Sequence, residues 1–185
     1  LAVGSTGNVV SVYEQRFGAT WTQLGSNLTG AAVAISSNGS RVVVTMHTYV
    51  RVYSFSDCAW QQVGSDIVAD YDFKLTVAMS STGTRVAVAK TDVFDNDYVE
   101  VYEESANGTW TRTGNQIAGV VRGMGKGLFM ASDGRRVAIW DGTNVNIYEE
   151  TVSGNWTQLG QGILAPSHQF ADVPSIAFSS NGVRV

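Results

Sequence analysis

One cysteine, two prolines and few charges set the first limits on this sequence. The single Cys58 excludes an internal disulfide and a cysteine-rich zinc site. Lys and Arg number 12 against 16 Asp and Glu, and a net charge of -4 lacks the basic excess typical of nucleic-acid-binding proteins. No apolar run approaches the ~20 residues that span a bilayer. We therefore expect no nucleic-acid partner and no membrane insertion by this segment.

Helical periodicity and catalytic motifs are also missing. No segment keeps a helical period over ten or more residues. The chain has no G-x-S-x-G, H-E-x-x-H, Walker or GxGxxG motif. Its two histidines, His47 and His168, lie in different repeats without the spacing of metal ligands. These absences predict a protein that is not an enzyme and needs no cofactor.

The sequence does contain a strong internal repeat. Two independent sets of anchor residues recur with one period, and successive tryptophans are 39, 50 and 46 positions apart. The anchors are the tyrosines Tyr13, Tyr53, Tyr102 and Tyr148, the tryptophans Trp21, Trp60, Trp110 and Trp156, and the glycines Gly39, Gly83, Gly134 and Gly182.

Each repeat indicates four short strands. The first is apolar, as in "AAVAIS" from Ala31, and a turn such as Asn38-Gly39 follows it. We predict a two-residue hairpin loop there, with positive φ at both central residues. The second strand, "RVVVT" from Arg41, is apolar enough for burial on both faces. The third alternates around Val50 and Val52, and the fourth contains the tryptophan and ends in glycine.

Four antiparallel strands in ~40–50 residues are typical of a β-propeller blade. We therefore predict an all-β fold of about four blades; a row of β-sandwich modules is the alternative. The chain begins and ends inside the same strand, which favours a segment of a larger propeller or array over a closed four-bladed ring. The predicted units are a partial blade at 1–26, blades at 27–68, 69–118 and 119–164, and a partial blade at 165–185.

The pattern "SSxGxRVAV…VxVYE…WTQLG" resembles propeller-type repeats of large secreted and surface proteins from diatoms, related algae and marine bacteria. It covers essentially the whole chain, and it lacks the features of WD, Kelch and FG-GAP repeats. The resemblance implies an extracellular scaffold or adhesion module. Its expected partners are other protein subunits of an extracellular assembly, with glycans as a second class.

Four N-x-[ST] sequons support secretion. Two of them occupy equivalent loops just before the tryptophan strand, and another lies in the first hairpin turn, so the loops are expected to be exposed. The sequon asparagines are Asn27, Asn38, Asn107 and Asn155. We expect an extracellular or cell-surface glycoprotein.

An acidic loop offers a weak candidate for calcium. Asp92, Asp95 and Asp97 alternate with other residues, and such oxygen ligands can hold Ca²⁺. The loop has no D-x-D-x-D-G pattern and no counterpart in the other repeats, so a solvated loop is the favoured interpretation and we assign no metal.

The remaining repeated side chains are interpreted as structural. A residue present in every blade serves the scaffold, because an enzyme site needs asymmetry. We expect the arginines after each turn to pair with carboxylates or loop carbonyls, and the aromatic residues to pack between blades. Trp140 replaces a small residue of the other repeats and is a candidate exposed contact. The arginines are Arg41, Arg85, Arg136 and Arg184.

The predicted function is a non-enzymatic structural or adhesive module that makes protein–protein contacts. The first alternative is a carbohydrate-binding propeller, which requires exposed aromatic side chains at equivalent loops. The second is a glycoside-cleaving propeller, which requires acidic residues from different blades near the central channel.

Overall fold

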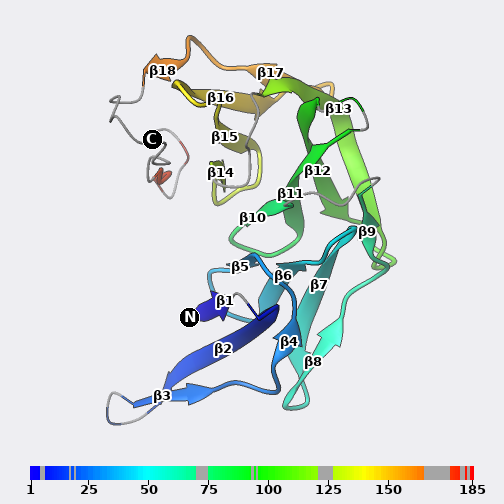
Figure 1. Ribbon diagram of the computed structural model, residues 1–185, viewed down its shortest axis with the longest axis vertical. Helices are drawn as coiled ribbons and strands as arrows, with labels where there is room; N and C mark the ends of the chain where they lie inside the picture. Colours follow the sequence, from blue (N-terminus) through cyan, green and yellow to red (C-terminus); the bar gives the residue numbers. More distant parts are fainter. Residues whose placement is uncertain are drawn as a thin grey trace.

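The protein consists of antiparallel sheets that follow one another along the chain and fan out in an arc (Figure 1). The computed structural model describes residues 1–4, 7–16, 18, 20–69, 75–92, 94, 96–120, 127–164, 176–179, 182 and 184–185. In this part of the chain no helix is long and apolar enough to cross a membrane. The predicted all-β propeller architecture is confirmed by this arrangement.

Each sheet runs from an inner strand on the concave side of the arc to an outer strand at its rim. The first sheet contains β1 (Ala2–Gly4), β2 (Val9–Arg16), β3 (Thr20–Gln23) and β4 (Leu28–Thr29). The second contains β5 (Val33–Ile35), β6 (Arg41–Thr45), β7 (Tyr49–Ser56), β8 (Ala59–Gln62) and β9 (Ile67–Val68). The third contains β10 (Thr76–Met79), β11 (Arg85–Thr91), β12 (Asp97–Glu104) and β13 (Trp110–Val120). The fourth contains β14 (Leu128–Met130), β15 (Arg136–Trp140), β16 (Asn144–Glu150), β17 (Trp156–Gln158) and β18 (Ile163–Leu164).

The outer strand is interrupted at the glycine that ends the tryptophan segment. Gly25, Gly64 and Gly160 have φ near +70°, which turns the chain away before it pairs again. In three sheets the outer edge is therefore made of two short strands, and β4 pairs with β2 of the first sheet. The third sheet keeps one long β13 and accommodates Gly114 through shifts in its pairing register with β12.

The repeated hairpin turn differs from the predicted two-residue loop. Only the glycine has positive φ, at +71° for Gly39, and its N–H donates to the carbonyl of Ser36. Asn38 keeps an ordinary backbone because its Oδ1 accepts hydrogen bonds from the Ser40 N–H and from the Ser36 and Ser40 hydroxyls. These side-chain bonds stabilise a longer turn that ends in a left-handed glycine.

A turn with two left-handed residues occurs elsewhere, between β7 and β8. Asp57 and Cys58 have φ of +50° and +61°, and they join the paired residues Ser56 and Ala59. This geometry favours Asn-Gly or Asp-Gly, so the second residue here carries a side chain where glycine is preferred.

The apolar core lies between the sheets and is repeated at each junction. The middle residues Val42, Val43 and Val44 of β6 are fully buried, although their side chains alternate between the two faces. Val42 and Val44 pack toward the first sheet, whereas Val43 packs toward the third. The predicted burial of this strand on both faces is confirmed, because the second sheet lies between the first and the third.

The repeated tryptophans join neighbouring sheets. The indole Nε1 of Trp60 donates to the Leu24 carbonyl at 2.8 Å, and that of Trp110 donates to the Val63 carbonyl at 2.9 Å. The Nε1 of Trp156 instead approaches the Thr113 hydroxyl at 3.4 Å. Each indole thus contacts the segment that precedes the outer-strand glycine of the sheet before it.

Trp60→Phe is expected to destabilise the fold by about 1–2 kcal/mol, because the carbonyl of the half-buried Leu24 loses its donor. The longer contact of Trp156 predicts a smaller loss for Trp156→Phe. Urea unfolding followed by circular dichroism measures both, and Trp21→Phe, at an indole without such a contact among the described residues, is the matched control. Equal losses for all three variants would contradict this role.

Cys58→Gly is expected to stabilise the protein by about 0.5–1 kcal/mol, because glycine adopts positive φ without the strain of a side chain. The exposed Cys58 thiol makes no contact that the change would remove. The midpoint of urea unfolding should rise for Cys58→Gly and stay unchanged for Cys58→Ser. A lower midpoint for the glycine variant would refute the proposed strain.

Candidate functional site

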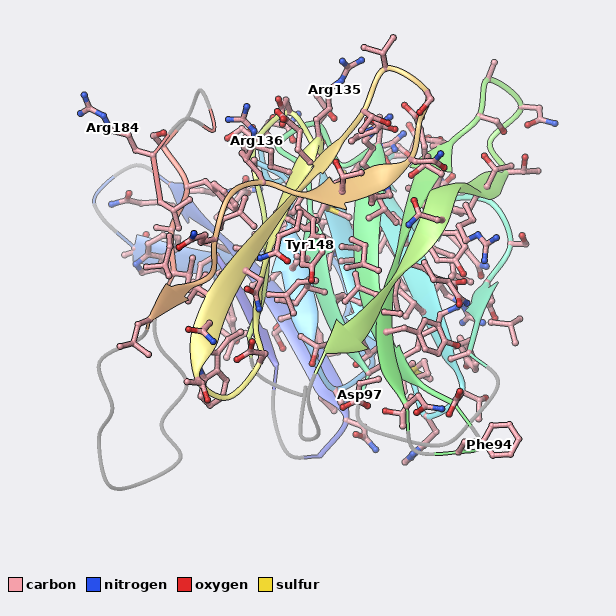
Figure 2. The ribbon with its side chains drawn as sticks, turned by 90° about the horizontal axis from the view of Figure 1, so that it is seen from above. Phe94, Asp97, Arg135, Arg136, Tyr148 and Arg184 are labelled. Carbon is pink, nitrogen blue, oxygen red and sulfur yellow. The ribbon has the colours of Figure 1, made fainter. Side chains whose placement is uncertain are left out.

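The two ends of the propeller differ in how its polar groups are used. The turn end carries the hairpins between the first and second strands of each sheet, and the loop end carries the connections between the second and third strands. Figure 2 shows Arg135, Arg136 and Arg184 on one side and Phe94 and Asp97 on the opposite side.

The turn end is joined by one contact repeated from sheet to sheet. The arginine that begins each second strand reaches the next hairpin and donates to its glycine carbonyl, as expected. The three such pairs are Arg41 with Gly83 at 3.2 Å, Arg85 with Gly134 at 3.3 Å, and Arg136 with Gly182 at 2.6 Å.

Carboxylates complete these arginine contacts. Arg41 forms an ion pair with Glu104 of the following sheet, and Arg85 does the same with Glu150 at 2.6 Å. Arg136 pairs with Glu149 of its own sheet at 2.8 Å. Arg41, Arg85 and Arg136 are therefore engaged in the scaffold and are not available to bind a substrate.

Residues at the loop end vary from blade to blade. The position after the common second strand is Met46 in the second sheet, Lys90 in the third and Asp141 in the fourth. Equivalent positions at the start of the third strand also differ. Thr48 immediately precedes β7, Asp97 is the first residue of β12, and Thr143 immediately precedes β16. Variation of this kind supplies the asymmetry that a functional site requires.

Lys90 belongs to a buried polar cluster in the third sheet. Its Nζ lies 2.7 Å from Glu100 Oε2 and 2.9 Å from the Val68 carbonyl of the preceding sheet. Glu100 also accepts hydrogen bonds from Tyr102 at 2.7 Å, Arg112 at 2.8 Å and Gln116 at 2.9 Å. Every charge in the cluster is paired, as burial requires.

These contacts shift the acidity of the cluster. Burial alone raises the pKa of Glu100, but the bonds from Lys90, Tyr102, Gln116 and Arg112 outweigh it and lower the pKa to about 2. Burial and the neighbouring Glu100 carboxylate raise the pKa of Tyr102. Glu100 is thus held as a carboxylate and Tyr102 as a phenol.

Other sheets replace this cluster with different polar groups at the same positions. In the second sheet Arg51 makes two bonds of 2.7 Å to Asp66, and Gln62 donates to the same carboxylate at 2.8 Å. In the first sheet Ser11 and Gln23 donate to Asn27 at 2.8 and 2.7 Å. The recurrence indicates that these groups join the third strand to the outer strand rather than bind a ligand.

Asp97 is an exception among the buried carboxylates. Its Oδ1 accepts a hydrogen bond of 2.6 Å from the Thr91 hydroxyl, whereas its buried Oδ2 has no partner. The residue is 7% exposed, and it lies on the same face of β12 as Val99, which packs against Leu128 of the fourth sheet. An open, buried carboxylate oxygen is costly to the fold and is a common feature of functional sites.

Trp140 is half-buried rather than the exposed contact considered from the sequence. It packs with Phe129, Ile176 and Phe178 on the outer face of the fourth sheet, and its Nε1 is buried without a partner. Its Cβ lies 2.6 Å from the place where a side chain at Gly127 would begin. The Trp140 indole thus occupies space on this face that the smaller residues at the equivalent positions of the other repeats do not occupy.

A hollow of about 350 Å³ lies where the inner strands meet. Its described lining side chains are apolar and come from Ala34 of β5, Val77–Met79 of β10, Leu128–Met130 of β14 and residues 176–178. In the described part of the chain, β5, β10 and β14 each pair with a neighbour on one side only. Their free edges therefore present backbone N–H and carbonyl groups along the axis.

Leu128 connects this hollow to Asp97. It lines the hollow and also packs in the same core cluster as Val99. The boundary between the third and fourth sheets thus has an apolar hollow toward the axis and, toward the loop end, a buried carboxylate with one unpaired oxygen. Sequence reasoning noted Asp97 only as a calcium ligand, because an unsatisfied oxygen becomes visible only with three-dimensional packing.

The structure does not assemble the candidate calcium ligands. Asp92 Oδ1 accepts bonds from the N–H groups of Phe94 and Asn96, so this carboxylate holds its own loop. Asp97 bonds to Thr91, and Asp95 lies outside the described residues. Over the described ranges no three His, Cys, Asp or Glu side chains gather as metal ligands.

All four sequon asparagines are exposed. In two of them the sequon hydroxyl donates to the asparagine Oδ1, from Ser40 to Asn38 at 2.8 Å and from Thr109 to Asn107 at 2.9 Å. Glycosylation and an extracellular location stay predictions.

Comparisons with known proteins give the fold. No protein-family profile and no curated protein matches the chain. Among solved structures, a protein of Bacteroides uniformis provisionally named a 6-phosphogluconolactonase has a TM-score of 0.65 and 13% identity over 88% of this chain and 54% of its own. The periplasmic gluconolactonase of Pseudomonas aeruginosa has a TM-score of 0.59 and 14% identity over 88% and 53%.

A further similar structure is TolB of Acinetobacter baumannii, with a TM-score of 0.52 and 18% identity over 98% of this chain and 43% of its own. At such identities the likeness shows the fold alone. The chain spans about half the length of the propellers that it matches.

The prediction of a non-enzymatic structural or adhesive module is corrected by these neighbours. Proteins named as lactonases have similar folds, so this fold is not confined to non-enzymatic modules. The physical reason for the error lies in the repeat. Its tryptophans and arginines are used inside the scaffold, so their regularity carries no information on function.

Acid is expected to weaken the fold through Glu100. Its folded pKa of about 2 lies below the usual value of 4.5, so its stabilising contribution is full above about pH 4.5 and is lost as the pH falls toward 2. The loss is on the order of 3 kcal/mol.

The free energy of unfolding, measured from pH 6 to pH 2, should therefore fall less steeply for Glu100→Gln than for the wild type. Glu14→Gln, at a more exposed carboxylate on a first-sheet strand, is the control and should keep the wild-type slope. An unchanged acid slope in Glu100→Gln would contradict this role of the cluster.

Proposed function

We propose that this chain contributes a site for hydrolysis of a small neutral lactone, located at the loop end between the third and fourth sheets. The observation that carries the proposal is Asp97, a buried carboxylate with one oxygen that accepts no hydrogen bond. Similar folds in proteins named as lactonases support the reaction class.

The proposed chemistry uses Asp97 as a general base. Its free oxygen takes a proton from water as the water oxygen attacks the lactone carbonyl, and Thr91 holds the other oxygen in place. The proton then passes to the ring oxygen as the ring C–O bond breaks, which yields a hydroxy acid. Backbone N–H groups on the inner edges of β5 and β14 are suited to stabilising the oxyanion.

The lining of the hollow selects the kind of substrate. Its volume of about 350 Å³ suits a small molecule, and its described lining residues are all apolar. We therefore propose a neutral ring ester rather than a phosphorylated one.

The chain is expected to hydrolyse glucono-δ-lactone faster than the spontaneous rate and to act more weakly on the 6-phosphorylated lactone. Asp97→Asn should reduce the enzymatic rate at least about 100-fold while the thermal melting curve is preserved. A pH-indicator assay measures both rates above the uncatalysed background.

Asp133→Asn is the matched control, because it removes the same charge from an exposed position at the turn end where another repeat has Asn38. It should leave the rate unchanged. Lack of any acceleration by the wild-type chain, or full activity in Asp97→Asn, would refute the proposed site.

A further inference from the structure

The hollow between the inner strands presents only hydrocarbon and thioether side chains among its described lining residues. A hydroxyl group placed against such side chains finds no hydrogen-bond partner on them, and a buried hydroxyl without a partner is costly. A hydrocarbon chain is favoured there, because each methylene moved out of water tightens binding about fourfold. The hollow therefore discriminates between lactones by the groups that their rings carry.

The lining of the hollow follows its strands from the loop end toward the turn end. Leu128 of β14 pairs with Ile139 near the loop end of β15, and Met130 pairs with Val137 near the turn end. β10 lies beside β14 and lines the hollow over an equivalent length. A strand rises about 3.3 Å per residue, so three residues extend over about 7 Å. A short alkyl chain can therefore lie along the hollow in this direction.

The carboxylate of the proposed site lies at the loop end of the same boundary. Figure 2 shows Asp97 at this end. Val99, on the same face of β12 as Asp97, belongs to one core cluster with Leu128, and Leu128 lines the hollow. A lactone whose carbonyl carbon is attacked by water beside Asp97 can thus direct a ring substituent past Leu128 into the hollow.

We propose that the substrate is a neutral lactone with an alkyl side chain, and that this chain lies in the hollow while the ester lies beside Asp97. The inference rests on the proposed hydrolysis at Asp97 and names its substrate class. Water adds to the ester carbonyl carbon, the ring C–O bond breaks, and the proton that Asp97 takes from water passes to the ring oxygen. The product is an open-chain hydroxy acid that keeps the alkyl chain, and water is the only co-reactant.

A sugar lactone matches the hollow less well than an alkyl lactone with the same ring. The hydroxyl groups of glucono-δ-lactone project from several ring carbons in different directions. Backbone groups on the inner edges of β5 and β14 can bond to some of them, but the described lining side chains can bond to none. Each hydroxyl buried without a partner is expected to weaken binding at least about fivefold.

Hydrolysis of three lactones with the same ring size tests the substrate class on the full chain. δ-Valerolactone has no side chain, δ-nonalactone carries a butyl chain, and glucono-δ-lactone carries hydroxyl groups. The kcat/KM for δ-nonalactone should exceed that for δ-valerolactone at least about 20-fold, mainly through a lower KM. It should also exceed that for glucono-δ-lactone when each rate is divided by the spontaneous rate of the same lactone.

Two substitutions in the wall of the hollow should change the preference in opposite directions. Ala34→Leu fills part of the hollow and should lower kcat/KM about tenfold more for δ-nonalactone than for δ-valerolactone. Met130→Ala extends the hollow and should favour a hexyl over a butyl side chain at least about threefold more than the wild type does. Ala118→Leu, at an exposed position on the outer strand β13, is the matched control and should leave all rates unchanged. Thermal melting checks that each variant folds.

Titration calorimetry with Asp97→Asn separates binding in the hollow from the chemistry. This slow variant should still bind δ-nonalactone at least about 20-fold more tightly than δ-valerolactone. Hydrolysis that depends on Asp97 but is equally fast with and without an alkyl chain would overturn the substrate class and leave the proposed hydrolysis intact. Acceleration of none of the three lactones would overturn both.

Discussion

The structure depends on one constraint, which is that each four-stranded sheet has two apolar faces and cannot bury both alone. Val42 and Val44 point to one neighbour while Val43 points to the other, and all three are fully buried. A sheet built in this way is stable only between two others. The indole N–H that donates to the preceding sheet and the arginine that donates to the next hairpin add polar contacts to that burial and join neighbouring sheets.

This constraint divides the molecule into a scaffold that is the same from repeat to repeat and an end whose residues differ between repeats. At the turn end every repeat uses the same arginine, glycine and carboxylate chemistry, so a change there disturbs a junction. At the loop end the described residues that follow the second strands differ from repeat to repeat. Lys90 and Asp97 have no counterparts in the other repeats. A propeller can therefore acquire a single asymmetric site at this end without loss of its packing.

Much of the fold could be predicted from the sequence because the repeat samples each strand several times. The buried second strand and the arginine contacts followed from residue type and position. The hairpin type did not, since the hydrogen bonds of Asn38 depend on the orientation of Ser36 and Ser40. The turn at Asp57-Cys58 contains no glycine that would indicate positive φ from the sequence. The cluster around Glu100 joins residues 10 to 16 positions apart, and no local pattern indicates such a set.

The error in the functional prediction has the same physical origin as the success with the fold. Repeated residues reflect what every blade needs, which is burial against its neighbours. They carry no information on the function of a single blade. The informative residues are those that break the repeat at a cost to stability. Asp97 retains a buried oxygen without a donor, where Thr48 and Thr143 of other repeats avoid a buried charge. A scaffold under selection for stability alone would replace such a carboxylate, so its presence is the strongest reason to look for chemistry between the third and fourth sheets.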